Sequence, residues 1–342
     1  MPLRPPNIPQ TTRKNLLLTL DAFETIFHPR QPVPVQYAQT AHAYGLPESL
    51  VTPESLKTSF KKTFKTLSAT RPNYGRADAL QGKYGGPRQW WEEVIRGSFG
   101  DILSRAQSAK GDGEKGDRDV KLPDGMVHAL LERFASKEGY ELYPDVNPFF
   151  RRMRDLKDIR RRGAGGGGAG FNNLVIGVVS NSDDRVPDIL KSLGLTVGET
   201  RADRDVVSTR LPGFEERSSP SSSSAATSDS QSQSKSQSQS QLQGQEINDI
   251  DLVITSYDAG AEKPSPLIFD VAKRQAQSLV PDSAGEWTCV HVGDHYEKDY
   301  QAATNAGWDG IFLPREDGQV AEGAKSVSSL GELADVLEEY GK

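Results

Sequence analysis

The fold follows from residues 16–27, LLLTLDAFETIF. An unbroken apolar run ends in an acid, Asp21, which small and polar residues follow. A central strand of a parallel sheet reads as a continuous hydrophobic run, and in open α/β sheets ligands bind outside the carboxyl ends of the strands. The pattern therefore predicts a buried strand that carries Asp21 to the ligand-binding edge of a sheet. The alternative is that Asp21 only caps the turn after the strand.

Three later segments repeat this arrangement of an apolar run followed by polar residues. They are 174–180, which ends in Ser180 before Asn181; 252–256, which precedes Lys263; and 288–292, which precedes Gly293 and Asp294, with Asp299 beyond. Helical periodicity marks 37–44, 53–67, 89–99, 125–134, 143–162, 185–193, 266–278, 299–306 and 330–340. Strands that alternate with helices predict an α/β fold, a Rossmann-like doubly wound parallel sheet with helices on both faces.

In this order the four segments resemble the four motifs of the haloacid dehalogenase (HAD) superfamily. Three further stretches, NYG at 73–75, RQWW at 88–91 and GDHYEKDYQAATNAG at 293–307, are similar to the eukaryotic group called haloacid dehalogenase-like hydrolase domain-containing protein 3. The resemblance covers the whole chain except its low-complexity segments. It implies a HAD core domain with an inserted helical cap domain.

The resemblance also implies a chemistry and assigns residues to it. Asp21 would attack phosphorus and form an aspartyl phosphate, with Ser180, Asn181 (through its backbone amide) and Lys263 binding the phosphate. Magnesium would be bound by Asp21, by the backbone carbonyl of Phe23 and by Asp294, and Asp299 would support the site. The resemblance thus implies three sets of residues: catalytic Asp21, Ser180 and Lys263; phosphate-binding Ser180, Asn181 and Lys263; and metal-binding Asp21, Phe23 and Asp294.

Phe23 departs from the phosphatase pattern. Phosphatases of this superfamily carry a second Asp two residues after the nucleophile, which protonates the leaving group, and phenylalanine cannot transfer a proton. General acid–base help is typically worth about 10²–10⁴-fold, so ordinary phosphate esters should react poorly unless Glu24 or His28 substitutes. Three functions stay open: a magnesium-dependent hydrolase of a small phosphorylated metabolite, a binding or regulatory protein that turns over little, and halide displacement from a 2-haloacid.

Composition and low-complexity segments divide the chain. Residues 1–13 hold four prolines and are predicted to be a flexible tail, 163–170 (GAGGGGAG) is predicted to be a linker, and 218–245, rich in Ser and Gln, is predicted to be a disordered insert. The glycine run precedes a strand, whereas a dinucleotide fingerprint follows one. The resemblance places the core at 14–29 and 141–342 and the cap at 30–140.

Aromatic side chains are prominent in the predicted cap. Trp90, Trp91 and Tyr74 are expected to fill its core, and the alternative is that they contact substrate. The stretch 108–121 has few apolar residues and is expected to be a mobile loop. The basic run 151–162 is expected to be a solvated helix face.

The overall charge limits the partners. A net charge of −6 gives no general attraction to nucleic acid or to an anionic membrane, so a small-molecule substrate is expected. The single cysteine, Cys289, excludes an intrachain disulfide and indicates a reducing compartment, and its apolar surroundings favour a buried, inert thiol. No signal peptide or membrane span is recognised, so the expected location is intracellular, with the cytoplasm favoured. The oligomeric state is not readable from the sequence.

Overall fold

The first strand, β1 (Lys14–Leu20), lies in the middle of a six-stranded sheet with the order β5-β6-β4-β1-β7-β8. Its parallel neighbours are β4 (Asn173–Ser180) and β7 (Glu286–Gly293). The outer strands are β6 (Ile250–Thr255), β5 (Val197–Thr200) and β8 (Asp309–Phe312), and they also pair in parallel. The predicted α/β fold with a parallel sheet is confirmed.

The computed structural model describes residues 14–109, 121–161, 171, 173–202, 247–280, 285–316 and 323–339. The predicted tail at 1–13, the glycine-rich linker at 163–170 and the Ser/Gln-rich insert at 218–245 lie outside the described residues. Ser108 and Ala109, assigned to a loop from the sequence, are the last two residues of a helix.

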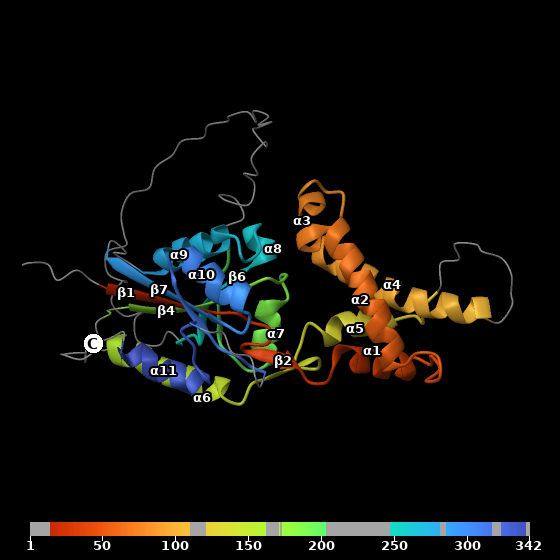
Figure 1. The fold of residues 1–342 in the computed structure, drawn as a ribbon, viewed down its shortest axis with the longest axis horizontal. Helices are drawn as coiled ribbons and strands as arrows, with labels where there is room; N and C mark the ends of the chain where they lie inside the picture. The colour runs from red at the N-terminus through yellow and green to blue at the C-terminus, as the bar shows by residue number, and fades with distance from the viewer. Residues whose placement is uncertain are drawn as a thin grey trace, which may run out of the picture.

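The strand β1 is buried on both faces. Leu16, Leu18 and Leu20 pack into one hydrophobic core, and Leu17 packs into the other, so successive side chains alternate as the pleat requires. Helices α6 (Val146–Arg161) and α11 (Leu330–Glu339) cover one face, and α9 (Pro266–Leu279) and α10 (Ala302–Asn305) cover the other (Figure 1). Each leucine that is fully buried contributes about 1.5–3 kcal/mol, which explains why the continuous apolar run forms the centre of the sheet.

The helices of residues 33–133 form a separate lobe beside the carboxyl edge of the sheet (Figure 1). This helical lobe consists of α1 (Val33–Ala43), α2 (Pro53–Thr70), α3 (Pro72–Leu80), α4 (Gly86–Ala109) and α5 (Met126–Arg133). An antiparallel ribbon, β2 (Phe27–Pro29) with β3 (Tyr140–Leu142), carries the chain into the lobe and back out of it. The sequence did not predict this ribbon, because each of its strands has only three residues.

Local sequence explains where the helices of the lobe begin and end. Thr52 accepts a hydrogen bond from the backbone N–H of Ser55, and the Ser55 hydroxyl accepts one from the backbone of Thr52, which forms a capping box before α2. Gly45 follows α1 with φ of 88°, a conformation that glycine adopts without strain. Pro34 lies in the first turn of α1, where a missing N–H costs nothing.

Two other expectations about helices were wrong in part. Residues 299–306 are not one α-helix, because a π-helical segment, η1 (Tyr296–Gln301), precedes α10. The basic run in α6 is not a uniformly solvated face: Lys157 is 7% exposed, and its Nζ lies 2.6 Å from Asp251 Oδ2. Arg154 likewise pairs with the buried Asp249. Asp249 and Asp251 come from the start of β6, so the local sequence of α6 could not reveal them.

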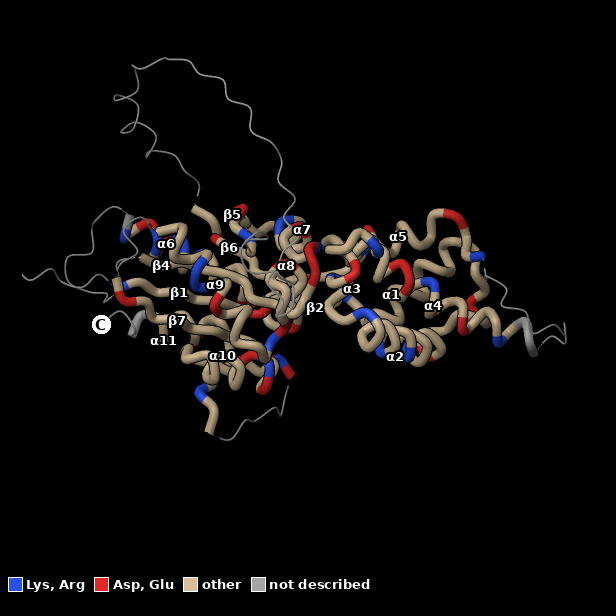
Figure 2. Tube along the Cα trace, turned by 90° about the horizontal axis from the view of Figure 1, so that it is seen from above, with Lys and Arg blue, Asp and Glu red and all other residues tan. Residues whose placement is uncertain are grey.

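Charged residues of both signs are interspersed along the sheet unit and the lobe (Figure 2). In the described part of the chain, no helix has the length and apolar content needed to cross a bilayer.

Candidate active site

A buried lysine joins the carboxyl ends of three strands. Lys263 is 3% exposed, and its Nζ donates to Asp21 Oδ1 at 2.8 Å, to Asp299 Oδ1 at 2.6 Å and to the Val179 carbonyl at 2.9 Å. All three ammonium protons therefore have acceptors. Burial alone would favour the neutral amine, but the adjacent carboxylates of Asp21 and Asp299 raise the pKa of Lys263 above its usual value. Lys263 is a charged group at the centre of the site.

Three carboxylates surround the open side of this lysine. Asp21, Asp294 and Asp299 can each place one oxygen so that all three oxygens lie within 4.8 Å of one another. Burial, and then the negative charges of Asp21 and Asp299, raise the pKa of Asp294 to about 7. Asp299 is also buried, but the charge of Lys263 holds the pKa of its carboxyl well below its usual range. Three acids against one lysine leave an excess of negative charge, and hard oxygen donors in such a cluster fit a magnesium ion.

The loop that carries Asp294 is fixed from two sides. The Thr25 hydroxyl donates to Asp294 Oδ1 at 3.0 Å and accepts from the Asp294 backbone N–H at 3.1 Å. At Gly293 an added Cβ would lie 2.3 Å from both Cγ and Oδ2 of Asp299, so only glycine allows the Asp299 carboxylate to pack there. The packing of Asp299 against the backbone therefore explains why a glycine, Gly293, precedes Asp294 in the sequence. Thr25 was not recognised from the sequence, although it lies only four residues after Asp21.

A buried histidine continues the polar chain beneath the site. His291 Nδ1 lies 2.8 Å from Thr19 Oγ1, and its Nε2 lies 3.3 Å from Asp299 Oδ1. Burial lowers the pKa of His291, so the ring is neutral at pH 7 and holds Asp299 without adding charge. The sequence showed His291 only as a polar residue within an apolar strand.

The structure places Ser180 and Asn181 at the end of β4, beside Lys263. Ser180 is buried and lines the same pocket as Asp21. The Asn181 side chain accepts from the Lys263 backbone N–H at 2.6 Å and donates to the Lys263 carbonyl at 2.8 Å. The Asn181 side chain therefore positions Lys263. The backbone N–H of Asn181 is the group that we expect to contact the phosphate.

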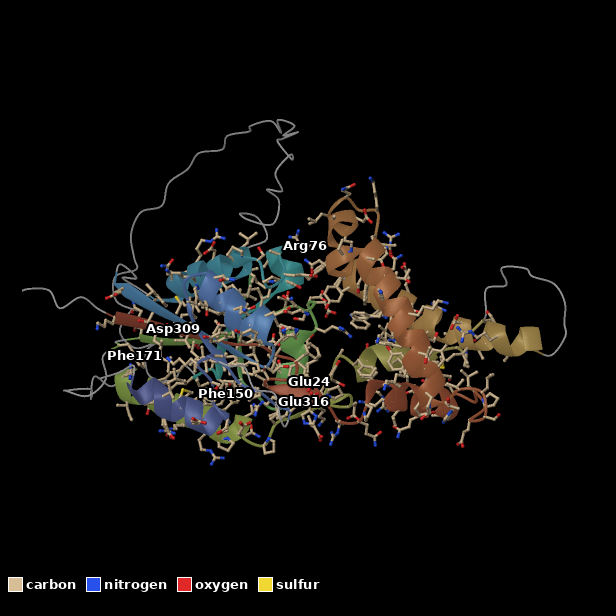
Figure 3. The ribbon with its side chains drawn as sticks, viewed as in Figure 1. Glu24, Arg76, Phe150, Phe171, Asp309 and Glu316 are labelled. Atoms are coloured by element: carbon tan, nitrogen blue, oxygen red, sulfur yellow. The ribbon has the colours of Figure 1, made fainter. Side chains whose placement is uncertain are left out.

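The ring of Phe23 stands next to Asp21 in the pocket. It packs edge-on against Phe27 and Tyr140, with centroid distances of 4.7 and 5.5 Å. Glu24 has φ of 54° and accepts a hydrogen bond from the Tyr143 hydroxyl at 2.9 Å. It lies where the sheet unit faces the lobe (Figure 3).

His28, the other residue considered as a substitute acid, lies on the ribbon strand β2. Its ring packs on Tyr143 with a centroid distance of 4.6 Å, and its Nδ1 lies 3.0 Å from the Pro29 carbonyl. Glu24 lines the pocket around Asp21, and His28 does not.

The pocket itself has a volume of about 320 Å³ and lies between the sheet and the helical lobe. The sheet unit contributes Asp21, Phe23, Glu24, Ser180, Asn181, Ser182, Asp183, Arg185, Lys263, Asp294, His295, Lys298 and Asp299, and the lobe with its ribbon contributes Phe64, Tyr74, Trp91 and Tyr140.

Trp90 and Trp91, adjacent in sequence, have different surroundings. Trp90 is 2% exposed and belongs to the core of the lobe, as expected. Trp91 instead lines the pocket, where its Nε1 donates to Asp183 Oδ2 at 2.7 Å. Asp183 and Arg185, which pair at 2.8 Å, were missed because nothing in a short stretch of the sequence relates them to the lobe.

Comparison with known proteins relates this parallel sheet, with acids around a buried lysine at its carboxyl edge, to a family of hydrolases. Residues 260–339 match the family model described as HAD-hydrolase-like. The haloacid dehalogenase-like hydrolase domain-containing protein 3 of Danio rerio is 26% identical over 299 residues, which cover 87% of this chain and 85% of that protein. An uncharacterized hydrolase of Schizosaccharomyces pombe is 25% identical over 300 residues, 88% of this chain and 91% of its own. Over most of its length the chain is similar to the haloacid dehalogenase-like hydrolases.

Solved structures show more distant likenesses. The 2-haloacid dehalogenase from Pseudomonas syringae pv. Tomato DC3000 has a TM-score of 0.46 and 17% identity, covering 95% of this chain and 99% of that chain. The HAD-hydrolase YfnB from Bacillus subtilis, bound to magnesium, has a TM-score of 0.46 and 14% identity, with the same coverage.

Proposed function

We propose that the protein is a magnesium-dependent hydrolase that removes the phosphoryl group of a small molecule, with Asp21 as the nucleophile. The observation that carries this proposal is the gathering of Asp21, Asp294 and Asp299 around a single buried ammonium group, Lys263. Burial, and then the negative charges of Asp21 and Asp299, raise the pKa of Asp294 to about 7. Such a site favours a divalent cation and an anionic substrate together.

The reaction proceeds in two displacements. A carboxylate oxygen of Asp21 forms a bond to phosphorus while the bond from phosphorus to the leaving oxygen breaks, and that oxygen departs with the electron pair. Water then attacks phosphorus in the aspartyl phosphate, and the bond to Asp21 breaks, which restores the carboxylate and releases inorganic phosphate. Lys263 holds Asp21 through Oδ1, and the Ser180 hydroxyl and the Asn181 backbone N–H donate to phosphate oxygens.

Asp21, the Phe23 backbone carbonyl and Asp294 would hold the magnesium ion, and Asp299 would hold Lys263 and the Asp294 loop. When bound, the ion supplies positive charge that offsets the charge of the phosphoryl oxygens. Thr25 keeps the Asp294 carboxylate at the site through its two hydrogen bonds. The helical lobe acts as the cap that covers the site and excludes water.

Phe23 limits which substrates can react. With Phe23 at the position where the superfamily phosphatases carry their acid, the leaving group departs best as a stable anion, as the carboxylate of an acyl phosphate does. The same feature favours a second candidate function, a binding protein of the HAD fold that holds magnesium and a phosphorylated ligand with little turnover. Halide displacement, the third function, also needs no acid, but it gives no role to the cluster of the Asp21, Asp294 and Asp299 carboxylates.

The test is phosphate release from acetyl phosphate with magnesium and with excess chelator. We expect release that depends on magnesium and falls at least about a thousandfold in Asp21→Asn. The matched control is Asp309→Asn, because Asp309 begins β8 at the opposite end of the sheet unit from the lobe (Figure 3). No release from acyl phosphates or phosphoesters by the folded wild-type protein would favour the binding protein, and release that survives Asp21→Asn would remove Asp21 as nucleophile.

A further inference from the structure

The pocket has an aromatic wall on the side away from Lys263. Phe64 from α2, Tyr74 from α3 and Trp91 from α4 line it together. The ring centroids of Phe64 and Tyr74 lie 6.0 and 6.3 Å from that of Trp91, so the three rings form one continuous surface. Phe23 and Tyr140 add a second pair of rings near Asp21. A small polar substrate would need no such surface.

The protein holds Trp91 in a fixed orientation. Its Nε1 donates to Asp183 at 2.7 Å, and the Arg185 guanidinium lies 4.6 Å from its ring centroid. Arg185 in turn donates from Nε and from Nη2 to the two oxygens of Asp183, at 2.8 Å each. Asp183 is 2% exposed, so this is an ordered arrangement rather than a mobile surface contact. A preorganised ring binds a flat group without first losing rotamer entropy.

The backbone at Tyr74 is strained in the same wall. Asn73 and Tyr74 have φ of 47° and 58°, a left-handed conformation that non-glycine residues rarely adopt. Two hydrogen bonds between Asn73 and Ser256, of 2.8 and 3.1 Å, hold this turn against α8 (Ser256–Ala259). Arg76 reinforces the contact by donating to the Tyr257 carbonyl between α3 and α8 (Figure 3). Backbone strain of this kind persists where the surrounding structure holds a side chain in a functional position. Here the strained backbone carries the Tyr74 ring, which lines the pocket.

The pocket offers the aromatic wall no buried cation that is left unpaired among the described residues. Among the described residues that line it, Lys263 is bound to Asp21 and Asp299, Arg185 is bound to Asp183, and Lys298 is exposed to solvent. A second phosphate or carboxylate at the wall would therefore lack a buried partner. The group that occupies it should be uncharged.

Behind Trp91 the pocket borders a small apolar hollow. This hollow of about 60 Å³ shares Trp91, Tyr140 and Arg185 with the pocket and is otherwise lined by Val33, Tyr37, Phe60, Ile95, Leu130, Leu131 and Phe134.

We propose that the group released from phosphate carries a single planar aromatic ring, which binds against Trp91 and Tyr74. This inference rests on the proposed hydrolase function and names its substrate class, an aryl ester or aroyl anhydride of phosphate. It also agrees with Phe23, since phenolates and arenecarboxylates are stabilised anions that leave with little help from an acid. Hydrolysis would consume one water and yield inorganic phosphate and the aromatic alcohol or acid.

Benzoyl phosphate and acetyl phosphate provide the matched test, because their leaving groups have similar acidity and differ in the ring. We expect kcat/KM to be at least about tenfold higher for benzoyl phosphate, mainly through KM. Trp91→Leu should abolish that preference, and Trp91→Phe should retain most of it. The control is Tyr44→Leu, since Tyr44 is an exposed ring at the end of α1 that does not line the pocket. Equal kcat/KM for the two substrates, or a preference that survives in folded Trp91→Leu, would overturn the assignment.

Binding by the wild-type protein separates this inference from the function on which it rests. Phenylphosphonate and methylphosphonate would be titrated in the presence of magnesium. Tighter binding of phenylphosphonate without hydrolysis of either acyl phosphate would support the aromatic subsite and contradict the hydrolase. Equal affinities, together with equal hydrolysis, would overturn the subsite and leave the hydrolase standing. No binding of either phosphonate and no hydrolysis would overturn both.

Discussion

Replacing Lys263 by methionine should destabilise the fold strongly. Met is similar in length but removes the ammonium group that Asp21, Asp299 and the Val179 carbonyl accept from. Lys263 and Asp299 are 3% and 1% exposed, so water cannot replace the lost partner. Removing one member of a buried ion pair costs about 3–5 kcal/mol, and we expect the free energy of unfolding of Lys263→Met to fall by that amount at pH 7.

The loss should shrink as the pH falls. Without Lys263, the buried acids have raised pKa values in the folded state, as Asp294 already has at about 7 against an ordinary 3.8. A carboxyl group whose pKa is higher in the folded than in the unfolded protein binds a proton more tightly in the folded state. Its protonation therefore stabilises the fold at a pH below the pKa of the unfolded state, and this stabilisation is lost as the pH rises through the pKa of the folded state. The difference between variant and wild type should therefore be largest near pH 7 and smaller at pH 5.

Urea unfolding followed by tryptophan fluorescence at both pH values measures this effect. The control is Lys62→Met, because Lys62 pairs with Asp101 at 3.1 Å but its side chain is 65% exposed, so we expect a loss below about 1 kcal/mol. If Lys263→Met lost no more stability than Lys62→Met, or if its loss grew toward pH 5, Lys263 would not be the charged centre of the site.

Three further changes test separate parts of the site. Phe23→Asp should raise magnesium-dependent hydrolysis of esters with poor leaving groups at least about tenfold and change acyl phosphates much less, and equal changes for both would show that proton transfer is not what the site lacks. Gly293→Ala should weaken magnesium binding at least about tenfold in calorimetry, because the added Cβ would lie 2.3 Å from Asp299; unchanged affinity would refute this steric argument. Burial raises the pKa of the Cys289 thiol to about 11, so iodoacetamide at pH 8 should label it more than about a hundredfold more slowly than free cysteine, and rapid labelling of the folded protein would contradict its burial.

The sheet was predictable because each of its central strands is an apolar run that can be recognised in the sequence alone. The apolar runs around Leu17, Ile176 and Val290 are long enough to be buried on both faces, and each ends in the polar residue that meets the others at the carboxyl edge. Asp21, Ser180, Lys263, Asp294 and Asp299 line one pocket for this reason. Their catalytic and metal-binding roles stay predictions.

The rest of the site depends on contacts between distant segments. Thr25 contacts Asp294 across 269 residues of sequence, and Trp91 contacts Asp183 across 92. Neither pair has a local periodicity or spacing that marks it. The ribbon of β2 and β3 was missed because strands of three residues bury too little to show an alternating pattern.

The central claim is that Asp21 becomes phosphorylated, and acid quench of a single turnover tests it most directly. The protein would be mixed with acetyl phosphate and magnesium, quenched in acid within the first turnover, digested, and examined by mass spectrometry for phosphopeptides. We predict phosphate on the peptide that contains Asp21, at the aspartate itself, and none in Asp21→Asn or with chelator present. Phosphate release at the wild-type rate with an unmodified Asp21, or phosphate on another residue, would contradict the account.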